Sequence, residues 1–289
     1  MTDARGPDFI CIGPKKTATT WLADHLKLHR DVWLTPIQEL NYLNGAFAQH
    51  RGKPHARLRW TRWEIVKRLV RNRSLSAAAD RRFFAAAEAA ASGTFDLDRY
   101  RALFAPAGQR LTGDISPMYA SLDAAEIARA MPVLERARVF MLARDPVQRF
   151  WSELSMHARK RSFGDVDYGS LEVVQSFFAD PERQKQHFMS RIAERWRGGL
   201  GDRLGVFVFD DIAADGEASL RAIVAFIGAD YAKRLPLVSA SRNRKAGRAA
   251  LAPSADSRAF VREAFREELR ACEDAFGAPG RHWRERHRD

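Results

Sequence analysis

The sequence has little cysteine and lacks a long apolar run. Only two cysteines occur among 289 residues, Cys11 and Cys272, so neither a disulfide framework nor a zinc cluster is indicated. Nothing approaches the roughly 18 consecutive apolar residues that a membrane-spanning helix needs. The N-terminal stretch MTDARGPD is polar and includes acids, which is unlike a signal peptide. We therefore expect a cytoplasmic protein in which Cys11, inside an apolar run, is buried.

Acidic residues are in the minority, because 36 Asp and Glu stand against 48 Lys and Arg, for a net charge of +12. Much of the excess lies between residues 51 and 73, where nine basic residues accompany a single acid, Glu64. Positive charge of this density attracts phosphates, sulfates, anionic glycans, nucleic acid or an anionic membrane surface. A solvated basic face is an equally good interpretation. The apolar residues of the segment partly recur at helical spacing, which predicts an amphipathic basic helix.

Short apolar runs alternate with helical patterns along most of the chain. Strands are predicted within 8–13, 31–35, 110–119, 137–143 and 203–209. An alanine-rich stretch and its neighbours predict a helical insertion at about 50–105. The alternation predicts an α/β fold, with a three-layer, mainly parallel sheet flanked by helices, in one domain that spans 1–289.

The stretch GPKKTATTWL, residues 13–22, lies where the first predicted strand turns into a helix. Backbone N–H groups at a helix N-terminus are unpaired, and the helix dipole favours negative charge there. Lys15 and Lys16 add positive charge, and three threonines add hydroxyl donors, so we predict a phosphate-binding loop. The loop is not a Walker A motif, because the sixth residue from Gly13 is Ala18 and the lysines precede it.

A second anion site is predicted where the strand at 137–143 ends in Arg144. Asp145 suits the N-cap of the following helix, and Pro146 suits its first turn. Ligands of open α/β sheets bind at the carboxyl ends of strands, so Arg144 should face the 13–22 loop if the two strands are parallel neighbours. Arg144 and the hydroxyl of Ser152 would together suit a phosphate. A helix-capping Arg–Asp pair is the alternative interpretation.

Taken together, these segments resemble sulfotransferases that use 3′-phosphoadenosine 5′-phosphosulfate (PAPS). GPKKTATTWL resembles the 5′-phosphosulfate loop of that family, and LARDPVQRFWSELS resembles its 3′-phosphate motif. HRDVWLTPIQELNYLN, YRALF with LTGDISPMY, and RWRGGLGDRLGVFVFDDI resemble further segments of the bacterial and glycan-type branch. The matches follow family order from about residue 8 to 228, and they imply a P-loop-like fold.

The resemblance implies specific roles in binding PAPS. Lys16 would contact the sulfuryl group and the leaving phosphate oxygen, and Arg144 and Ser152 would hold the 3′-phosphate. The amides of the loop would cradle the 5′-phosphate, and a late basic loop would cover the phosphates. The residues concerned are Thr17, Ala18, Thr19, Thr20 and Trp21 in the first loop and Lys245, Gly247 and Arg248 in the second. Ala18 stands where the family has glycine, and is costly there if the position needs a positive φ.

The resemblance also implies an acceptor side. Glu39 matches the general base of the branch, and Asn41 stands where a histidine is frequent and would orient the acceptor hydroxyl. We expect Arg57, Arg59 and Arg62 of the basic segment to meet an anionic acceptor, or the segment to touch a membrane surface. In GDISPMY, the uncharged Ile115 cannot supply the lysine charge that some members have there.

The implied activity is transfer of the sulfuryl group from PAPS, without a metal, to a hydroxyl or amine of a glycan, lipid or small metabolite. Two alternatives stay open. A P-loop-like nucleotide kinase could use Asp210 and Asp211 to hold magnesium, but it would need a Gly-Lys-[ST] core. A non-catalytic polyanion-binding protein would use the 51–73 segment, in which Trp60 and Trp63 lie between basic residues. A specific nucleic-acid partner is not expected.

Overall fold

The computed structural model describes residues 6–49, 77–91, 95–233 and 251–288. In them the strands are β1 (Phe9–Cys11), β2 (Val32–Leu34), β3 (Leu111–Ile115), β4 (Arg138–Ala143) and β5 (Gly205–Val208). The α-helices are α1 (Thr19–Leu26), α2 (Ala46–Gln49), α4 (Ala77–Ala91), α5 (Leu97–Ala102), α6 (Ala124–Leu134), α7 (Pro146–Lys160), α8 (Leu171–Ala179), α9 (Pro181–His187), α10 (Met189–Leu200), α11 (Phe209–Ala214), α12 (Gly216–Phe226), α13 (Ala255–Ala264), α14 (Arg266–Phe276) and α15 (Ala278–Arg286). The 3₁₀ turns are η1 (Ala105–Ala107), η2 (Pro117–Ser121), η3 (Gly201–Arg203) and η4 (Tyr231–Lys233).

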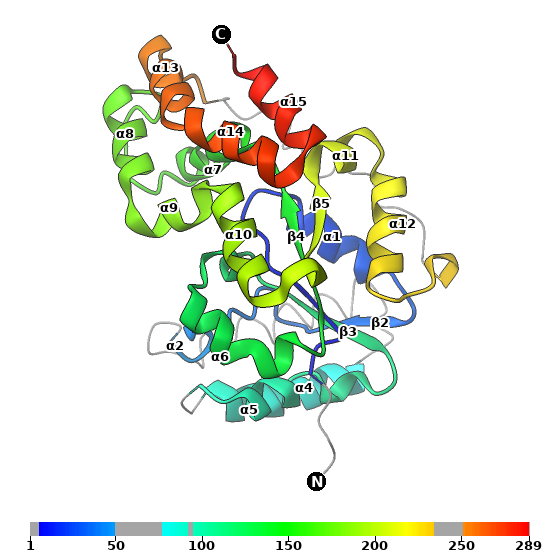
Figure 1. Cartoon of the computed structure of the whole chain (residues 1–289). Helices are drawn as coiled ribbons and strands as arrows, with labels where there is room; N and C mark the ends of the chain where they lie inside the picture. The colour runs from blue at the N-terminus through cyan, green and yellow to red at the C-terminus, as the bar shows by residue number, and fades with distance from the viewer. Residues whose placement is uncertain (1–5, 50–76, 92–94, 234–250, 289) are drawn as a thin grey trace.

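The strands form one parallel sheet in the order β2-β3-β1-β4-β5, which confirms the predicted fold class (Figure 1). β1 is central, with Ile10 in register with Asp114 of β3 on one side and Val139 of β4 on the other. The segments that follow β1, β3 and β4 therefore leave the same edge of the sheet side by side. This edge is where α/β proteins bind ligands.

Side chains that alternate along the strands enter two separate cores. Ile10 of β1 belongs to a core that contains Ile127 of α6 and Trp196 of α10. Phe9 and Cys11 belong to the opposite core, which also holds apolar residues of α1 and α12. Helices thus cover both faces of the sheet, so the three-layer prediction and the burial of Cys11 are both confirmed.

The described part of the predicted insertion is helical and belongs to the core. Phe83 of α4 is fully buried and meets the ring of Trp33 edge to face, with ring centroids 6.1 Å apart. The indole N–H of Trp33 donates to Asp80 at 3.2 Å. α4 therefore packs against β2 at one border of the sheet.

Two helical stretches in the second half of the chain are each divided into two helices. Phe265 has non-helical ψ and separates α13 from α14. α11 ends at Ala214, and Asp215 then caps α12 with its side chain. No described helix combines the length and the apolar character that crossing a bilayer requires.

Candidate active site at the carboxyl edge of the sheet

The loop after β1 adopts a backbone that few side chains tolerate. Gly13 has φ of 89°, and a Cβ there would lie 2.4 Å from the Cα of Pro117. Lys16 and Ala18 have φ of 68° and 78°, in the left-handed region. Ala18 therefore occupies a conformation that favours glycine, as the family pattern suggested. The hydroxyl of Thr17 is buried and donates to the carbonyl of Pro14 at 2.7 Å, so the expectation that it faces a ligand is wrong.

The loop ends in a helix N-terminus with unpaired donors. Ala18 is the N-cap of α1 and makes no side-chain cap, and the first turn holds no acidic residue. Among the described residues, the backbone N–H groups from 16 to 21 have no protein acceptor. Thr19 and Trp21 are buried, whereas Thr20 is exposed. These amides can bind an anion at the positive end of the helix dipole.

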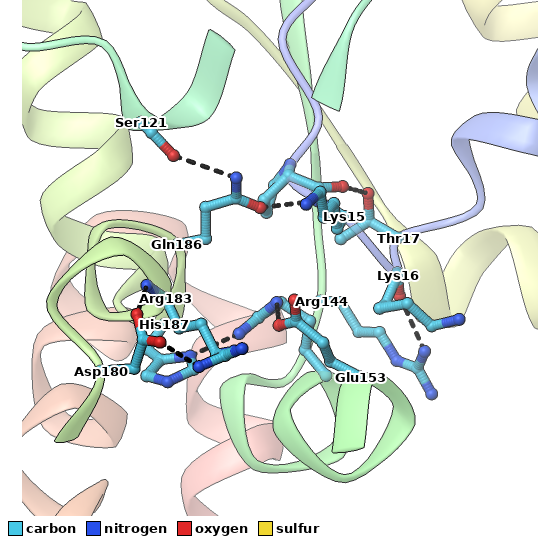
Figure 2. Close-up of polar contacts among 12 residues, drawn as sticks. Lys15, Lys16, Thr17, Ser121, Arg144, Glu153, Asp180, Arg183, Gln186 and His187 are labelled. Carbon is cyan, nitrogen blue, oxygen red and sulfur yellow. Dashed lines mark hydrogen bonds and ion pairs between the residues drawn. The ribbon is translucent and has the colours of Figure 1, made fainter. Parts of the chain in front are cut away.

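Arg144 lies against this loop, as predicted (Figure 2). Its Nη1 donates to the carbonyl of Lys16 at 2.8 Å, and its guanidinium carbon lies 4.0 Å from the ring centroid of Phe209. Burial lowers the pKa of Lys16 below that of an ordinary lysine, and Arg159 and Arg144 lower it further. Like charges gathered in this way are unfavourable until an anion joins them.

Ser152, the other predicted phosphate ligand, is half-buried in the second turn of α7. Its hydroxyl has no hydrogen bond to the described residues, so it is available to a ligand. The predicted N-cap is confirmed, because Asp145 accepts from the N–H groups of Val147 and Gln148 at 3.0 and 3.1 Å.

Glu39 and the start of α1 line one pocket. The residues that line it include Thr19 and Thr20 of α1, Glu39, and Asp114 of β3. Glu39 is exposed and has φ of 56°. The side-chain Oδ1 of Asn41 is buried with no hydrogen-bond partner among the described residues. The predicted base therefore lines the same pocket as the first residues of α1, which follow the predicted phosphate loop.

Sequence analysis did not identify two features near Lys15 and Lys16, the contacts of Gln186 and the positive charges of Arg159 and Lys160. Gln186 of α9 is buried, accepts from the N–H of Lys15 at 3.3 Å and donates to the hydroxyl of Ser121 at 3.0 Å (Figure 2). A pair of long-range contacts to one glutamine leaves no local pattern in a sequence. Arg159 and Lys160, which add positive charge near Lys16, are visible in the sequence as the basic last turn of a helix.

A buried charge network joins α7 to α9. Arg149 is fully buried and donates to Glu153 at 2.8 Å and to Nδ1 of His187 at 2.6 Å. Burial and the charge of Arg149 lower the pKa of His187 to about 3, so His187 is neutral and accepts at Nδ1. This network fixes α7, which carries Ser152, against the helix that carries Gln186.

The C-terminal helix, α15, contacts residues that follow β4 and β5 at the carboxyl edge of the sheet. Arg286 donates to Asp145 at 3.0 Å and to Asp210 at 2.9 Å, and Trp283 donates to Asp210 at 2.9 Å. Burial opposes ionisation of Asp210, but hydrogen bonds from Arg286 and Trp283 outweigh it and lower the pKa. The carboxylate of Asp210 is therefore engaged by the protein rather than presented to a metal ion.

A more voluminous cleft, about 690 Å³, lies between α13, α14 and α15. None of the predicted site residues that the structure describes lines it. Part of its arginine lining pairs with glutamates of the same helices, as Arg270 does with Glu267 at 2.7 Å. The chemistry predicted from the sequence therefore belongs to the carboxyl edge and not to this cleft.

The remaining predicted residues cannot be placed. Lys245, Gly247 and Arg248, and the arginines 57, 59 and 62, lie outside the described residues. Within the described residues, no group of three or more His, Cys, Asp or Glu side chains could hold a metal ion.

Comparisons with known proteins agree on one family. The family model described as "Sulfotransferase family" matches residues 7–233. The fold is similar to a sulfotransferase from Alicyclobacillus acidocaldarius, with a TM-score of 0.62 and 17% identity, over 96% of this chain and 98% of that one. It is also similar to the sulfotransferase domain from the curacin biosynthetic pathway (TM-score 0.50, 18% identity, 78% of this chain and 76% of that one) and to sulfotransferase STF9 from Mycobacterium avium (0.50, 13%, 94% and 77%). A search of curated proteins found no match.

Proposed function

The chain belongs to the sulfotransferase family, and from this premise we propose that it transfers the sulfuryl group of PAPS to a hydroxyl or amine of an acceptor. One observation carries the proposal. Unpaired amides at the start of α1 lie near Lys16 and Arg144, a combination that suits an anion, and a carboxylate, Glu39, lines a pocket together with the first residues of α1. We thereby assign donor binding to the start of α1 and proton removal to Glu39, within one site.

The donor side suits a ligand with two separate phosphate positions. Amides of residues 17–21 and the Lys16 ammonium would hold the 5′-phosphosulfate at the end of α1. Arg144 and Ser152 would hold the 3′-phosphate, with the guanidinium fixed between Phe209 and the carbonyl of Lys16. Lys245, Gly247 and Arg248 complete this proposed set from outside the described residues.

The proposed chemistry is an in-line displacement at sulfur. Glu39 takes the proton of the acceptor hydroxyl while the acceptor oxygen forms a bond to sulfur and the bond from sulfur to the phosphate oxygen breaks. The electron pair of that bond stays on the leaving phosphate, where Lys16 offsets the added negative charge. As in phosphoryl transfer, positioning and charge stabilisation supply most of the catalysis.

On the acceptor side, the proposed class is a hydroxyl- or amine-bearing glycan, lipid or small metabolite, with Asn41 orienting the reacting group. An anionic acceptor would meet Arg57, Arg59 and Arg62. We also propose that the chain is a single domain. We place it in the cytoplasm, because its two cysteines are free and buried, as is usual in a reducing compartment. A nucleotide kinase is less well supported, since Asp210 is already bound by Arg286 and Trp283.

Calorimetry and a transfer assay together test the proposal. Adenosine 3′,5′-bisphosphate should bind and raise the melting temperature more than adenosine 5′-monophosphate, with or without EDTA. Radiolabelled PAPS should then label at least one member of a panel of an alkyl glucoside, a chitin disaccharide and long-chain and aromatic alcohols. Equal binding of the two nucleotides, or binding that requires magnesium, would contradict the donor assignment.

A further inference from the structure

The loop that carries Glu39 is held by side chains of the segment that follows β3. The N–H of Asn41 donates to the hydroxyl of Ser116 at 3.1 Å. The N–H groups of Tyr42 and Leu43 both donate to the hydroxyl of Tyr119, at 2.9 and 3.3 Å. Three consecutive amides next to the proposed base therefore end on two side chains rather than on backbone carbonyls.

Asp114 orders these two hydroxyls. Its carboxylate is almost fully buried and accepts from Ser116 at 2.6 Å, Tyr119 at 2.6 Å and Tyr100 at 2.9 Å. Because each hydroxyl gives its single proton to the carboxylate, its lone pairs face the loop and accept from the amides. The backbone of Leu40 makes a further hydrogen bond to Asp114. A backbone with left-handed residues such as Glu39 and Asn41 needs such external support.

The same segment is also fixed to the end of β1, where the loop of residues 13–18, the donor loop, begins. The N–H of Ser116 donates to the carbonyl of Cys11 at 3.1 Å, and the N–H of Ala120 donates to that of Ile12 at 2.9 Å. Gly13 lies so close to Pro117 that no Cβ would fit. The segment from 116 to 120 is therefore bonded by its backbone to the residues that lead into the donor loop, and by its side chains to the loop that carries Glu39, the acceptor loop.

We propose that Tyr119, oriented by Asp114 and supported by Ser116, is a positioning residue that fixes Glu39 relative to the donor loop. The inference rests on the proposed role of Glu39 as the base. The hydroxyl of Tyr119 would position the carboxylate of Glu39 through the loop backbone, without contacting that carboxylate.

Tyr100 supplies a matched control. Tyr100 and Tyr119 are both fully buried, and both donate to the same oxygen, Oδ2 of Asp114. Only Tyr119 accepts from the Glu39 loop. Replacing either with phenylalanine keeps the ring and removes one hydrogen bond to Asp114, so a difference between the two variants reports on the loop.

The experiment compares Tyr119→Phe with Tyr100→Phe. In Tyr119→Phe, kcat should fall about 10- to 100-fold, because small misplacements of a reacting group are costly. The Kd for adenosine 3′,5′-bisphosphate should stay within about threefold, and hydrogen exchange at the amides of Tyr42 and Leu43 should accelerate. Tyr100→Phe should change kcat less than about threefold and leave those amides protected.

A double-variant cycle separates positioning from a general loss of structure. In a Glu39→Gln background, Tyr119→Phe should cost less than about threefold, because the group that it positions is gone. Equal kcat for the two phenylalanine variants, or a full additive loss in the cycle, would overturn the proposal. If no panel member accepts a sulfuryl group, the proposed function fails instead, and amide exchange alone decides whether Tyr119 holds the loop.

Discussion

The loops after β1 and β2 share a backbone feature but differ in what their amides do. Each has left-handed, non-glycine residues at alternate positions, Lys16 and Ala18 in the first and Glu39 and Asn41 in the second. In the first loop, the N–H groups that open α1 have no protein acceptor among the described residues. In the second, those of 41–43 are taken by side chains after β3.

This difference indicates two ways of building a binding surface. A loop that leaves its amides unpaired is itself the ligand site, and charges such as Lys16 add to it. A loop whose amides are hydrogen-bonded within the protein cannot bind a ligand through them. It positions side chains instead, so its chemistry depends on those side chains. The donor side should therefore respond to loss of charge by binding less, and the acceptor side should respond by reacting more slowly.

The largest effect is expected for Glu39→Gln on the acceptor loop. Turnover should fall by roughly 10²–10⁴-fold, the usual contribution of a general base. The Kd for adenosine 3′,5′-bisphosphate should hardly change, because Glu39 lies on the loop after β2 and is not among the groups proposed to hold the phosphates. Steady-state kinetics and calorimetry measure the two quantities, with Asp24→Asn, an exposed acid of α1, as the control. A near wild-type kcat would place the base elsewhere.

On the donor side, Lys16→Ala and Arg144→Ala should each weaken binding of the bisphosphate. Loss of one charge-assisted contact costs about 1.5–3 kcal/mol, or about 10- to 150-fold in Kd. Lys15→Ala removes the same charge from the adjacent position and should cost less, since only the backbone of Lys15 is tied into the site. If calorimetry gave an unchanged Kd for both the Lys16 and the Arg144 variant, the assignment of bisphosphate binding to the donor side would be refuted.

Most of the donor side followed from the sequence because its signals are local. A strand that ends in Gly-Pro and a strand that ends in Arg-Asp-Pro both locate helix N-termini, and parallel pairing then brings the two together. The contact between Arg144 and the carbonyl of Lys16 is the structural expression of that pairing. The hydroxyl of Thr17 was misjudged because residue type alone does not show that a side chain turns back onto Pro14.

The supports of the site were not predictable, because they join residues far apart in the chain. Gln186 meets Lys15 across 171 positions, and Arg286 meets Asp145 across 141. Neither lies in a motif, since each contributes one side chain whose partner is set by packing. The roles of Asp114 and Tyr119 were equally hidden, because GDISPMY shows polar residues in sequence but not that they face the amides of another loop.

A smaller effect is expected from pH on the donor loop. Burial lowers the pKa of Lys16, so its ammonium loses a proton at a lower pH than an ordinary lysine does. Affinity for the bisphosphate should be complete below that pKa and should decline as pH rises through it. Lys16→Arg, which stays charged, should bind with a flatter profile over the alkaline range below pH 10.5, the ordinary lysine value. Parallel profiles by calorimetry would mean that the charge of Lys16 does not contribute to binding.

The smallest effect tests the shared backbone feature itself. An alanine in the left-handed region is strained by about 1–2 kcal/mol, whereas glycine is not and asparagine is tolerated. Ala18→Gly should therefore raise the free energy of unfolding by about 1 kcal/mol after the added chain entropy of glycine is subtracted. Asn41→Gly, at a similar φ in the other loop, should gain nothing. Ala23→Gly, inside α1, should lose about 1 kcal/mol as an ordinary helical site does. Denaturant melts give all three values, and a loss at Ala18 equal to that at Ala23 would show that the left-handed conformation of Ala18 carries no strain.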